Sequence, residues 1–180
     1  MATTTTRLMT FEEYQAVPNP PGGIFELHHG ELFKVAFPEF PHVGAQWQLR
    51  RLLESAAGDA GIVEKEMPYR PLPEHECWGA DVAFVSKARW ESIDRYFFGA
   101  PELVIDVLAP SNSVDELLEK RKLCLENGSR EFWTVDTKRR QVEISTPDGH
   151  TITYKSGTYK SGQEIPLLFG GHLAVDAIFA

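Results

Sequence analysis

An acidic residue lies inside the most apolar run of this chain. Residues 103–108 read Leu-Val-Ile-Asp-Val-Leu, so Asp106 interrupts a segment that otherwise has the composition of a strand buried on both faces. An ionised carboxylate in such a strand costs several kcal/mol unless another group pairs with it. Because Asp106 is in the middle of the strand, it cannot be explained as a cap of a turn. The run therefore favours a functional role for Asp106.

A second acid, Asp81, has a similar setting at the start of the apolar residues 81–85. If the two strands are neighbours, Asp81 and Asp106 supply the oxygen ligands that Mg²⁺ prefers. Phosphodiester hydrolysis needs such a cation to bind the phosphate and to generate hydroxide. A structural alternative exists for Asp81, because an aspartate after Gly79 and Ala80 can simply cap a turn before a strand.

The helix expected over residues 114–126 offers a lysine for the same chemistry. At 100° per residue its apolar side chains gather on one face, and Glu116, Lys120 and Cys124 form a stripe along one flank. Lys122 falls on the opposite flank, so we expect Lys120 to serve the site and to stabilise charge on a reacting phosphate. Glu116, on the same stripe, is then an accessory residue of the site. The alternative is that Glu116 and Lys120 form an ordinary surface pair of the i,i+4 kind.

Two further residues are candidates with weaker signals. Glu31 follows a His-Gly turn, where it is either an early acid of the site or an exposed hairpin residue. His42 follows Pro41 at the start of an expected helix, where it is either an accessory residue or a helix cap.

Composition limits the classes of protein that this chain can belong to. The 180 residues are 42% hydrophobic and 24% charged, which suits one globular domain over 1–180. No apolar stretch approaches the roughly 20 residues that cross a bilayer, and we expect a cytoplasmic protein. Cys77 and Cys124 have no disulfide or zinc spacing. The net charge of −8 disfavours non-specific DNA binding, although acids gathered around a metal still permit cleavage.

The order of expected elements indicates a mixed α/β sheet with helices packed on it. Turn residues and capping signals separate helices from strands along the whole chain. We expect helices over 10–16, 43–57, 90–98 (in part) and 114–126, and strands over 24–27, 31–35, 66–72, 81–85, 103–108, 132–135, 142–144 and 152–154, with a turn at 110–113.

Several of these segments together resemble the Uma-two family of endonuclease-like proteins. The resemblance rests on Phe25-Glu26-Leu27-His28-His29-Gly30-Glu31-Leu32, Pro41-His42, Ala80-Asp81-Val82-Ala83-Phe84-Val85, Pro101-Glu102-Leu103-Val104-Ile105-Asp106-Val107-Leu108-Ala109-Pro110-Ser111, Lys120 and Gly128-Ser129-Arg130-Glu131-Phe132-Trp133-Thr134-Val135-Asp136. It implies the PD-(D/E)XK, restriction-endonuclease-like fold, with a mixed sheet flanked by helices, a core over about 24–136, an N-terminal helix and hairpin, and C-terminal antiparallel strands.

The resemblance also implies a site made of Glu31, Asp81, Asp106 and Lys120. Glu31 corresponds to the early acid, Asp81 and Asp106 to the strand acids, and Lys120 replaces the lysine that the motif usually has at the position of Leu108. Mg²⁺ or Mn²⁺ is the implied cofactor, held by the three acids, and a nucleic acid, DNA in the first place, is the implied substrate.

The chain also departs from the pattern of the family. Ala80 stands where the family usually has proline, Asp106 where it has the longer glutamate, and Cys124 where it has tyrosine. These changes keep open the alternative of a catalytically weakened nuclease-fold module that binds a partner. Aromatic residues in 90–98 and 151–159 lead us to expect a homodimer.

Overall fold

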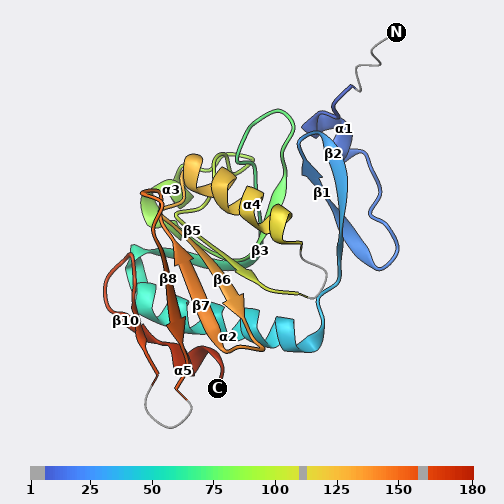
Figure 1. Cartoon of the computed structure of the whole chain (residues 1–180). Helices are drawn as coiled ribbons and strands as arrows, with labels where there is room; N and C mark the ends of the chain where they lie inside the picture. The colour runs from blue at the N-terminus through green and yellow to red at the C-terminus, as the bar shows by residue number, and fades with distance from the viewer. Residues whose placement is uncertain (1–6, 110–112, 158–161) are drawn as a thin grey trace.

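A six-stranded mixed sheet forms the centre of the computed structural model, which describes residues 7–109, 113–157 and 162–180 (Figure 1). Its strands follow the order β3-β4-β5-β6-β7-β8, and only the pair β5–β6 is parallel. The strands are β3 (Gly61–Tyr69), β4 (Trp78–Ser86), β5 (Leu103–Val107), β6 (Glu131–Asp136), β7 (Gln141–Ser145) and β8 (Thr151–Lys155). The expected mixed sheet flanked by helices is therefore confirmed.

Two long helices cover opposite faces of this sheet (Figure 1). Helix α2 (Phe40–Ala57) buries Leu49 and Leu53 against one face, in the same cluster as Ile105 of β5. Helix α4 (Val114–Glu126) buries Cys124 in the cluster that contains Val104. Since successive side chains of a strand point to opposite faces, β5 serves both clusters and is apolar on both sides.

The N-terminal elements form a separate small layer beside α4 (Figure 1). Helix α1 (Phe11–Gln15) begins with the expected capping box of Thr10 and Glu13. Strands β1 (Gly23–His28) and β2 (Glu31–Ala36) then form the expected hairpin. Leu27 attaches this hairpin to the rest of the fold, because its backbone exchanges two hydrogen bonds with that of Cys77, just before β4.

Short elements complete the face of the sheet that α2 covers. The hairpin of β9 (Glu164–Pro166) and β10 (His172–Ala174) and the last helix, α5 (Val175–Ile178), bury apolar residues in the α2 cluster. The remaining described elements are the 3₁₀ turn η1 (Gly58–Ala60) and the short helix α3 (Lys87–Glu91). Helix α3 begins three residues before the expected segment 90–98 and overlaps only its first two residues. Among the described residues, the structure holds no helix that is long and apolar enough to cross a membrane.

The largest difference from the expected elements concerns β3, which begins at Gly61 rather than at Glu66. We interpreted Gly58 and Gly61 as a joint end of the preceding helix. Gly58 does end α2, with a φ of 48°, but the backbone of Gly61 is extended and opens the strand. A Cβ atom at Gly61 would lie 2.1 Å from the Val85 carbonyl oxygen, so close strand pairing explains this glycine. The expected turn at 110–113 lies mostly outside the described residues.

The α2 face of the core gives a direct test of the packing. We expect Leu49→Ala to lower the free energy of unfolding by about 3 kcal/mol, because it leaves a cavity under the sheet. The same substitution at Leu118, which is exposed on α4, should cost only about 0.5 kcal/mol. Urea denaturation of both variants measures the difference, and equal losses would contradict the assigned packing.

Candidate active site

Asp81 and Asp106 lie side by side where strands β4 and β5 separate. The antiparallel pairing of these strands joins Val82 with Ile105 and does not extend to the two acids. At this point the side chain of Asp81 takes the place of a strand, because its Oδ2 atom accepts the backbone N–H of Val107 at 2.6 Å. The sequence thus places both carboxylates at a gap in the sheet that a charged side chain fills.

Lys120 reaches Asp106 from helix α4, on the face of the sheet that α4 covers. Its Nζ atom lies 2.8 Å from each oxygen of the Asp106 carboxylate and donates a further hydrogen bond to the Gly79 carbonyl at 2.7 Å. The capping box at Ser113 sets the start of α4, and Cys124 anchors the next turn beside the Tyr69 hydroxyl at 3.1 Å. Helix α4 is therefore fixed on both sides of Lys120, at its start by the capping box and one turn after the lysine by Cys124.

Helix α2 contributes a second group of polar side chains from the opposite face. The Nε2 atom of His42 lies 3.0 Å from Oδ1 of Asp81, and the Gln46 amide donates to the same oxygen at 2.8 Å. Gln46 also donates to the carboxylate of Glu66. His42 and Gln46 are four residues apart, so they lie on the same face of the helix.

Glu66 reaches this group because the pairing of β3 with β4 is interrupted at this residue. The pairs run from Lys65↔Val82 to Met67↔Ala80 in an unchanged register, so Glu66 lies opposite Asp81 without pairing with it. Its φ of 50° is in the left-handed region, which a residue with a side chain rarely occupies. Such unusual backbone is common at functional sites, and here the carboxylate of Glu66 accepts a hydrogen bond from Gln46.

The N-terminal hairpin supplies a further buried acid, Glu26. Its Oε1 atom accepts the Gly79 N–H at 3.0 Å, and its Oε2 atom lies 2.6 Å from the His28 ring, which stacks on Trp78. A Cβ atom at position 79 would lie 2.8 Å from the same Glu26 oxygen, so a glycine permits this approach. Glu26 and Lys120 thus hold the backbone of Gly79 from its two ends.

The environment separates the pKa values of the two strand acids. Burial raises the pKa of Asp106 to about 6, and the charges of Asp81 and Glu26 add to that effect, while Lys120 opposes it. Burial also disfavours the charge on Asp81, but the hydrogen bond and charge of His42, followed by the Lys120 charge and the Val107 N–H, outweigh it and lower its pKa. Burial opposes the charge of Lys120, yet Asp106 and its neighbouring acids raise the pKa of this lysine. Both carboxylates and the lysine are therefore charged at neutral pH.

The structure brings most of the expected site residues together. Lys120 contacts Asp106 and His42 contacts Asp81 directly, and the charge of Lys120 also acts on Asp81. Glu31 is exposed at the start of β2, and the described contacts do not join it to those four residues. The Glu116 side chain accepts the Ser113 N–H and so caps α4, as the capping-box pattern also predicted.

Sequence reasoning did not identify three acidic or amide residues of this cluster. Gln46 could have been found from its position one turn after His42. Glu26 carries a weaker signal, since it alternates with apolar residues in an expected strand. Glu66 carries no signal, because nothing in the sequence indicates the interrupted pairing and left-handed backbone at this residue.

The sheet is mixed, and two strand acids and a lysine from a helix meet where β4 and β5 separate. This arrangement places the chain in the class of restriction-endonuclease-like folds. The comparisons agree. The family model Uma2, described as "Putative restriction endonuclease", matches residues 11–175, and the chain belongs to that family.

A solved structure shows the same fold. It is described as "a putative nuclease belonging to DUF820" from Anabaena variabilis ATCC 29413. The two chains are 18% identical and superpose with a TM-score of 0.81, over 95% of this chain and 97% of the other. The comparison with curated proteins gave no match.

The Lys120–Asp106 pair makes stability depend on pH in a specific direction. Lys120→Met leaves the Asp106 carboxylate buried without its partner, which should cost about 3 kcal/mol at neutral pH. An acid with a raised pKa binds its proton more tightly in the folded state, so its contribution to stability falls as pH rises through that pKa. Without the lysine, the pKa of Asp106 lies above about 6, and the fall extends to higher pH.

We therefore expect the loss in Lys120→Met to be smaller at about pH 5 than at about pH 7.5 in urea denaturation. The exposed Lys122→Met serves as the control, with little change at either pH. Adding Asp106→Asn to Lys120→Met should remove the pH dependence, and a loss that is equal at both pH values would contradict the proposed electrostatics.

Proposed function

We propose that this protein is a metal-dependent nuclease that hydrolyses phosphodiester bonds of DNA. The observation that carries the proposal is the contact of Lys120 with Asp106, beside Asp81, at the gap between β4 and β5. Membership of the Uma2 family and the fold of the Anabaena protein support a nuclease. The nature of the nucleic acid and the need for a metal are part of the proposal.

The donor groups of the site suit a hard divalent cation. Asp81, Asp106 and Glu66 offer carboxylate oxygens, which Mg²⁺ and Mn²⁺ prefer. Burial, followed by the charges of Asp81 and Glu26, raises the pKa of Asp106 against the opposing charge of Lys120, and a bound cation would favour its ionised form further. Among the described residues, no group of three acids, histidines or cysteines is already arranged to hold an ion. Lys120, Gln46 and the Val107 N–H hold the carboxylate oxygens instead.

The residues of the site are assigned to metal binding, to stabilisation of charge on the phosphate and to orientation of Asp81. A bound Mg²⁺ or Mn²⁺ supplies positive charge for the phosphate and lowers the pKa of a water molecule. Asp81 and Asp106 are assigned to the ion, with Glu31 from the early part of the chain still a prediction. Lys120 places its ammonium group where negative charge develops on a phosphate, and His42 and Gln46 orient Asp81.

A non-catalytic nuclease-fold module is the second candidate. It is favoured by the absence, among the described side chains, of a preformed group of metal ligands, and by the two hydrogen bonds with which Lys120 holds Asp106 and Gly79. In this alternative the same polar cluster stabilises the fold and does no chemistry. A cleavage assay separates the two candidates.

We expect the wild-type protein to cleave DNA with Mn²⁺ and to lose the activity with EDTA. Asp106→Asn and Asp81→Asn should lower the rate by at least about 100-fold, since each removes a ligand charge from the site. Single- and double-stranded DNA and RNA are compared, and thermal unfolding verifies that each variant is folded.

Glu116→Ala is the matched control for an acid outside the cluster, with activity close to that of the wild type. Unchanged cleavage in folded Asp106→Asn would exclude this site. No cleavage of any substrate, together with no Mn²⁺ binding by calorimetry, would favour the non-catalytic module.

We also propose a homodimer, as the aromatic segments 90–98 and 151–159 led us to expect. Support comes from β8, an edge strand of the sheet on which Ile152 is exposed, and from the exposed Phe98. An exposed edge strand can pair with that of a second copy. Tyr159 lies outside the described residues. The cytoplasmic location likewise stays a prediction from the sequence.

Light scattering at micromolar concentration tests the dimer, with an expected mass of twice 20.3 kDa. Ile152→Glu should shift the mass to that of the monomer, because it places a charge on the edge strand. Val114→Glu, at an exposed position of α4, is the control. A wild-type mass of 20.3 kDa would contradict the proposal.

A further inference from the structure

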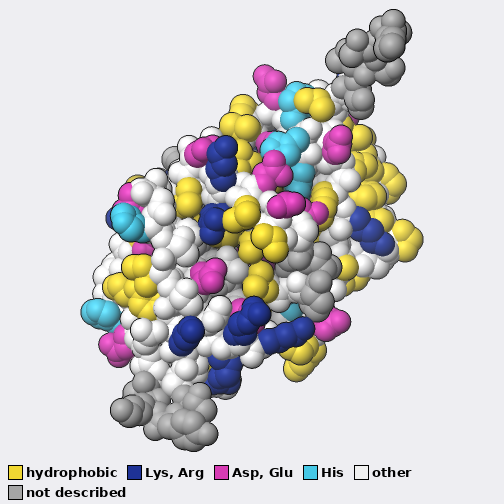
Figure 2. Space-filling view, in the orientation of Figure 1, with side chains coloured by type: hydrophobic (Ala, Val, Ile, Leu, Met, Phe, Trp, Pro, Cys, Tyr) yellow, Lys and Arg dark blue, Asp and Glu magenta, His cyan; other side chains and the backbone are white. Residues whose placement is uncertain are grey.

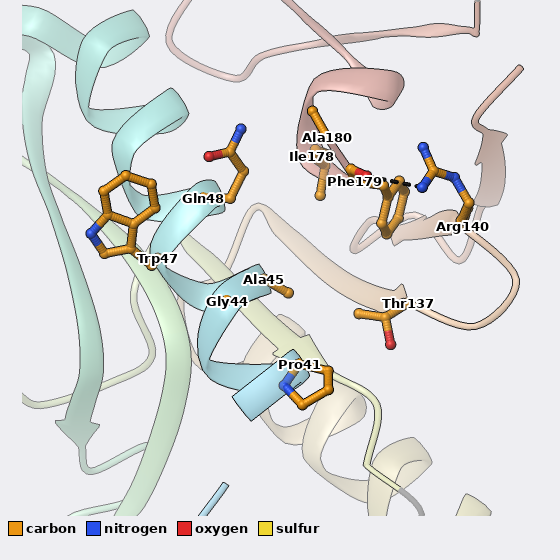
Figure 3. Close-up of a pocket in the computed structure, with 10 residues that line it drawn as sticks. All are labelled: Pro41, Gly44, Ala45, Trp47, Gln48, Thr137, Arg140, Ile178, Phe179 and Ala180. Carbon is orange, nitrogen blue, oxygen red and sulfur yellow. Dashed lines mark hydrogen bonds between the residues drawn. The ribbon is translucent and has the colours of Figure 1, made fainter. Parts of the chain in front are cut away.

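A groove lies beside the candidate active site, between helix α2 on one side and the β6–β7 turn and the C-terminal residues Ile178 to Ala180 on the other (Figure 3). It has a volume of about 370 Å³, in the range of pockets that hold a small molecule. Pro41, Gly44 and Gln48 line it from α2, and Thr137 and Arg140 line it from the opposite side. The hydrogen bond from Arg140 to the Phe179 carbonyl at 2.9 Å holds that side in place.

An aromatic side chain stands at the α2 edge of this groove. Trp47 is 57% exposed, although tryptophan usually buries most of its surface. The guanidinium of Arg51 lies 5.7 Å from the centre of its ring, and Phe40, at the start of the same helix, is 86% exposed. The solvent-facing side of a helix does not require such large apolar side chains. The exposed rings of Trp47 and Phe40 offer flat surfaces for stacking.

Positive charge gathers at the opposite edge. The chain carries a net charge of −8, yet Lys138, Arg139 and Arg140 follow one another in the β6–β7 turn. Figure 2 shows dark blue side chains gathered over this end of the sheet. Lys138 is exposed, and Arg139 remains 76% exposed although it pairs with Asp136 at 3.1 Å. Both cations are therefore free to contact a polyanion.

The groove adjoins the candidate active site through both of its walls. On α2, Pro41 lines the groove and the next residue, His42, contacts Asp81. On the sheet, Thr134 is the register partner of Asp106, and the basic turn begins just beyond the end of the same strand, β6. At about 3.3 Å per residue, the end of β6 at Asp136 lies roughly 7 Å along the strand from the level of Asp106, and the basic turn follows directly.

We propose that this groove binds an unpaired stretch of nucleic acid that extends from the candidate active site. A base stacks on Trp47 at the α2 edge, and phosphates of neighbouring nucleotides along the strand contact Lys138 and Arg139 at the opposite edge. An aromatic surface next to a cationic one is the usual arrangement for single strands, because only an unpaired base exposes its face for stacking. The inference rests on the proposed function for the choice of nucleic acid as ligand, and it specifies a single-stranded segment.

Gly44 gives the sharpest test, because a Cβ atom at this position would meet nothing within 4 Å and would point into open space. Gly44→Leu should therefore fill the groove without disturbing the core, and leucine is a better helix former than glycine. Binding is measured by fluorescence anisotropy with a labelled oligothymidylate of about a dozen nucleotides and with the matching duplex, in EDTA so that no cleavage occurs.

We expect the single strand to bind more tightly than the duplex. Gly44→Leu and Trp47→Ala should each weaken binding of the single strand about tenfold, while the melting temperature of Gly44→Leu stays at or above that of the wild type. The double variant Lys138→Ala/Arg139→Ala should weaken binding and reduce its salt dependence, because fewer phosphates are neutralised. The controls are Trp90→Ala and Lys122→Ala, which change an exposed tryptophan and an exposed lysine elsewhere.

Equal binding by the wild type and the folded groove variants, or tighter binding of the duplex, would overturn the inference. The outcome is independent of the cleavage assay. Binding that depends on the groove, together with absent cleavage, would refute the nuclease and retain the strand-binding surface. Cleavage that depends on Asp106 but is unaffected by Trp47→Ala and Gly44→Leu, with unchanged binding, would retain the nuclease and reject the groove.

Discussion

The ion pair of Asp106 and Lys120 is the interaction on which the rest of this site depends. It joins the central strand β5 to helix α4 across the core, with both side chains mostly buried. A buried ion pair is a weak source of stability, because desolvation of the two charges offsets their attraction. Stability alone therefore does not account for the pair, and the nuclease activity that we propose gives it a role at the gap in the sheet.

The gap itself depends on irregular backbone on both sides of β4. Strand β5 stops pairing with β4 before Asp81, and the Asp81 side chain satisfies the Val107 N–H that pairing would otherwise satisfy. On the other side, the pairing of β3 with β4 is interrupted at Glu66, whose left-handed backbone accompanies the contact of its carboxylate with Gln46. Regular strands would have left each of these acids facing only a neighbouring strand, so the irregularities assemble the cluster.

Charge is distributed unevenly over this acidic protein. The carboxylates of the candidate site are concentrated between two helices, where burial first, and then the neighbouring acids, raise the pKa of Asp106. The cations of the β6–β7 turn lie at the same end of the sheet but outside that cluster. For the binding of a polyanion that we propose, these cations matter more than the net charge, because exposed cations within a Debye length act more strongly than distant acids.

The sequence by itself determined the main helices, most of the central strands and the central pair of the candidate site. Capping boxes marked the starts of α1 and α4, the helical spacing selected Lys120 rather than Lys122, and the acid within an apolar run identified Asp106. These are local signals, carried by residues within a few positions of one another. The tertiary structure decided that Glu26 and Glu66 join the cluster, because the attachment of a hairpin and an interruption in strand pairing bring them from distant strands. Contacts between distant segments depend on backbone pairing that no local pattern encodes.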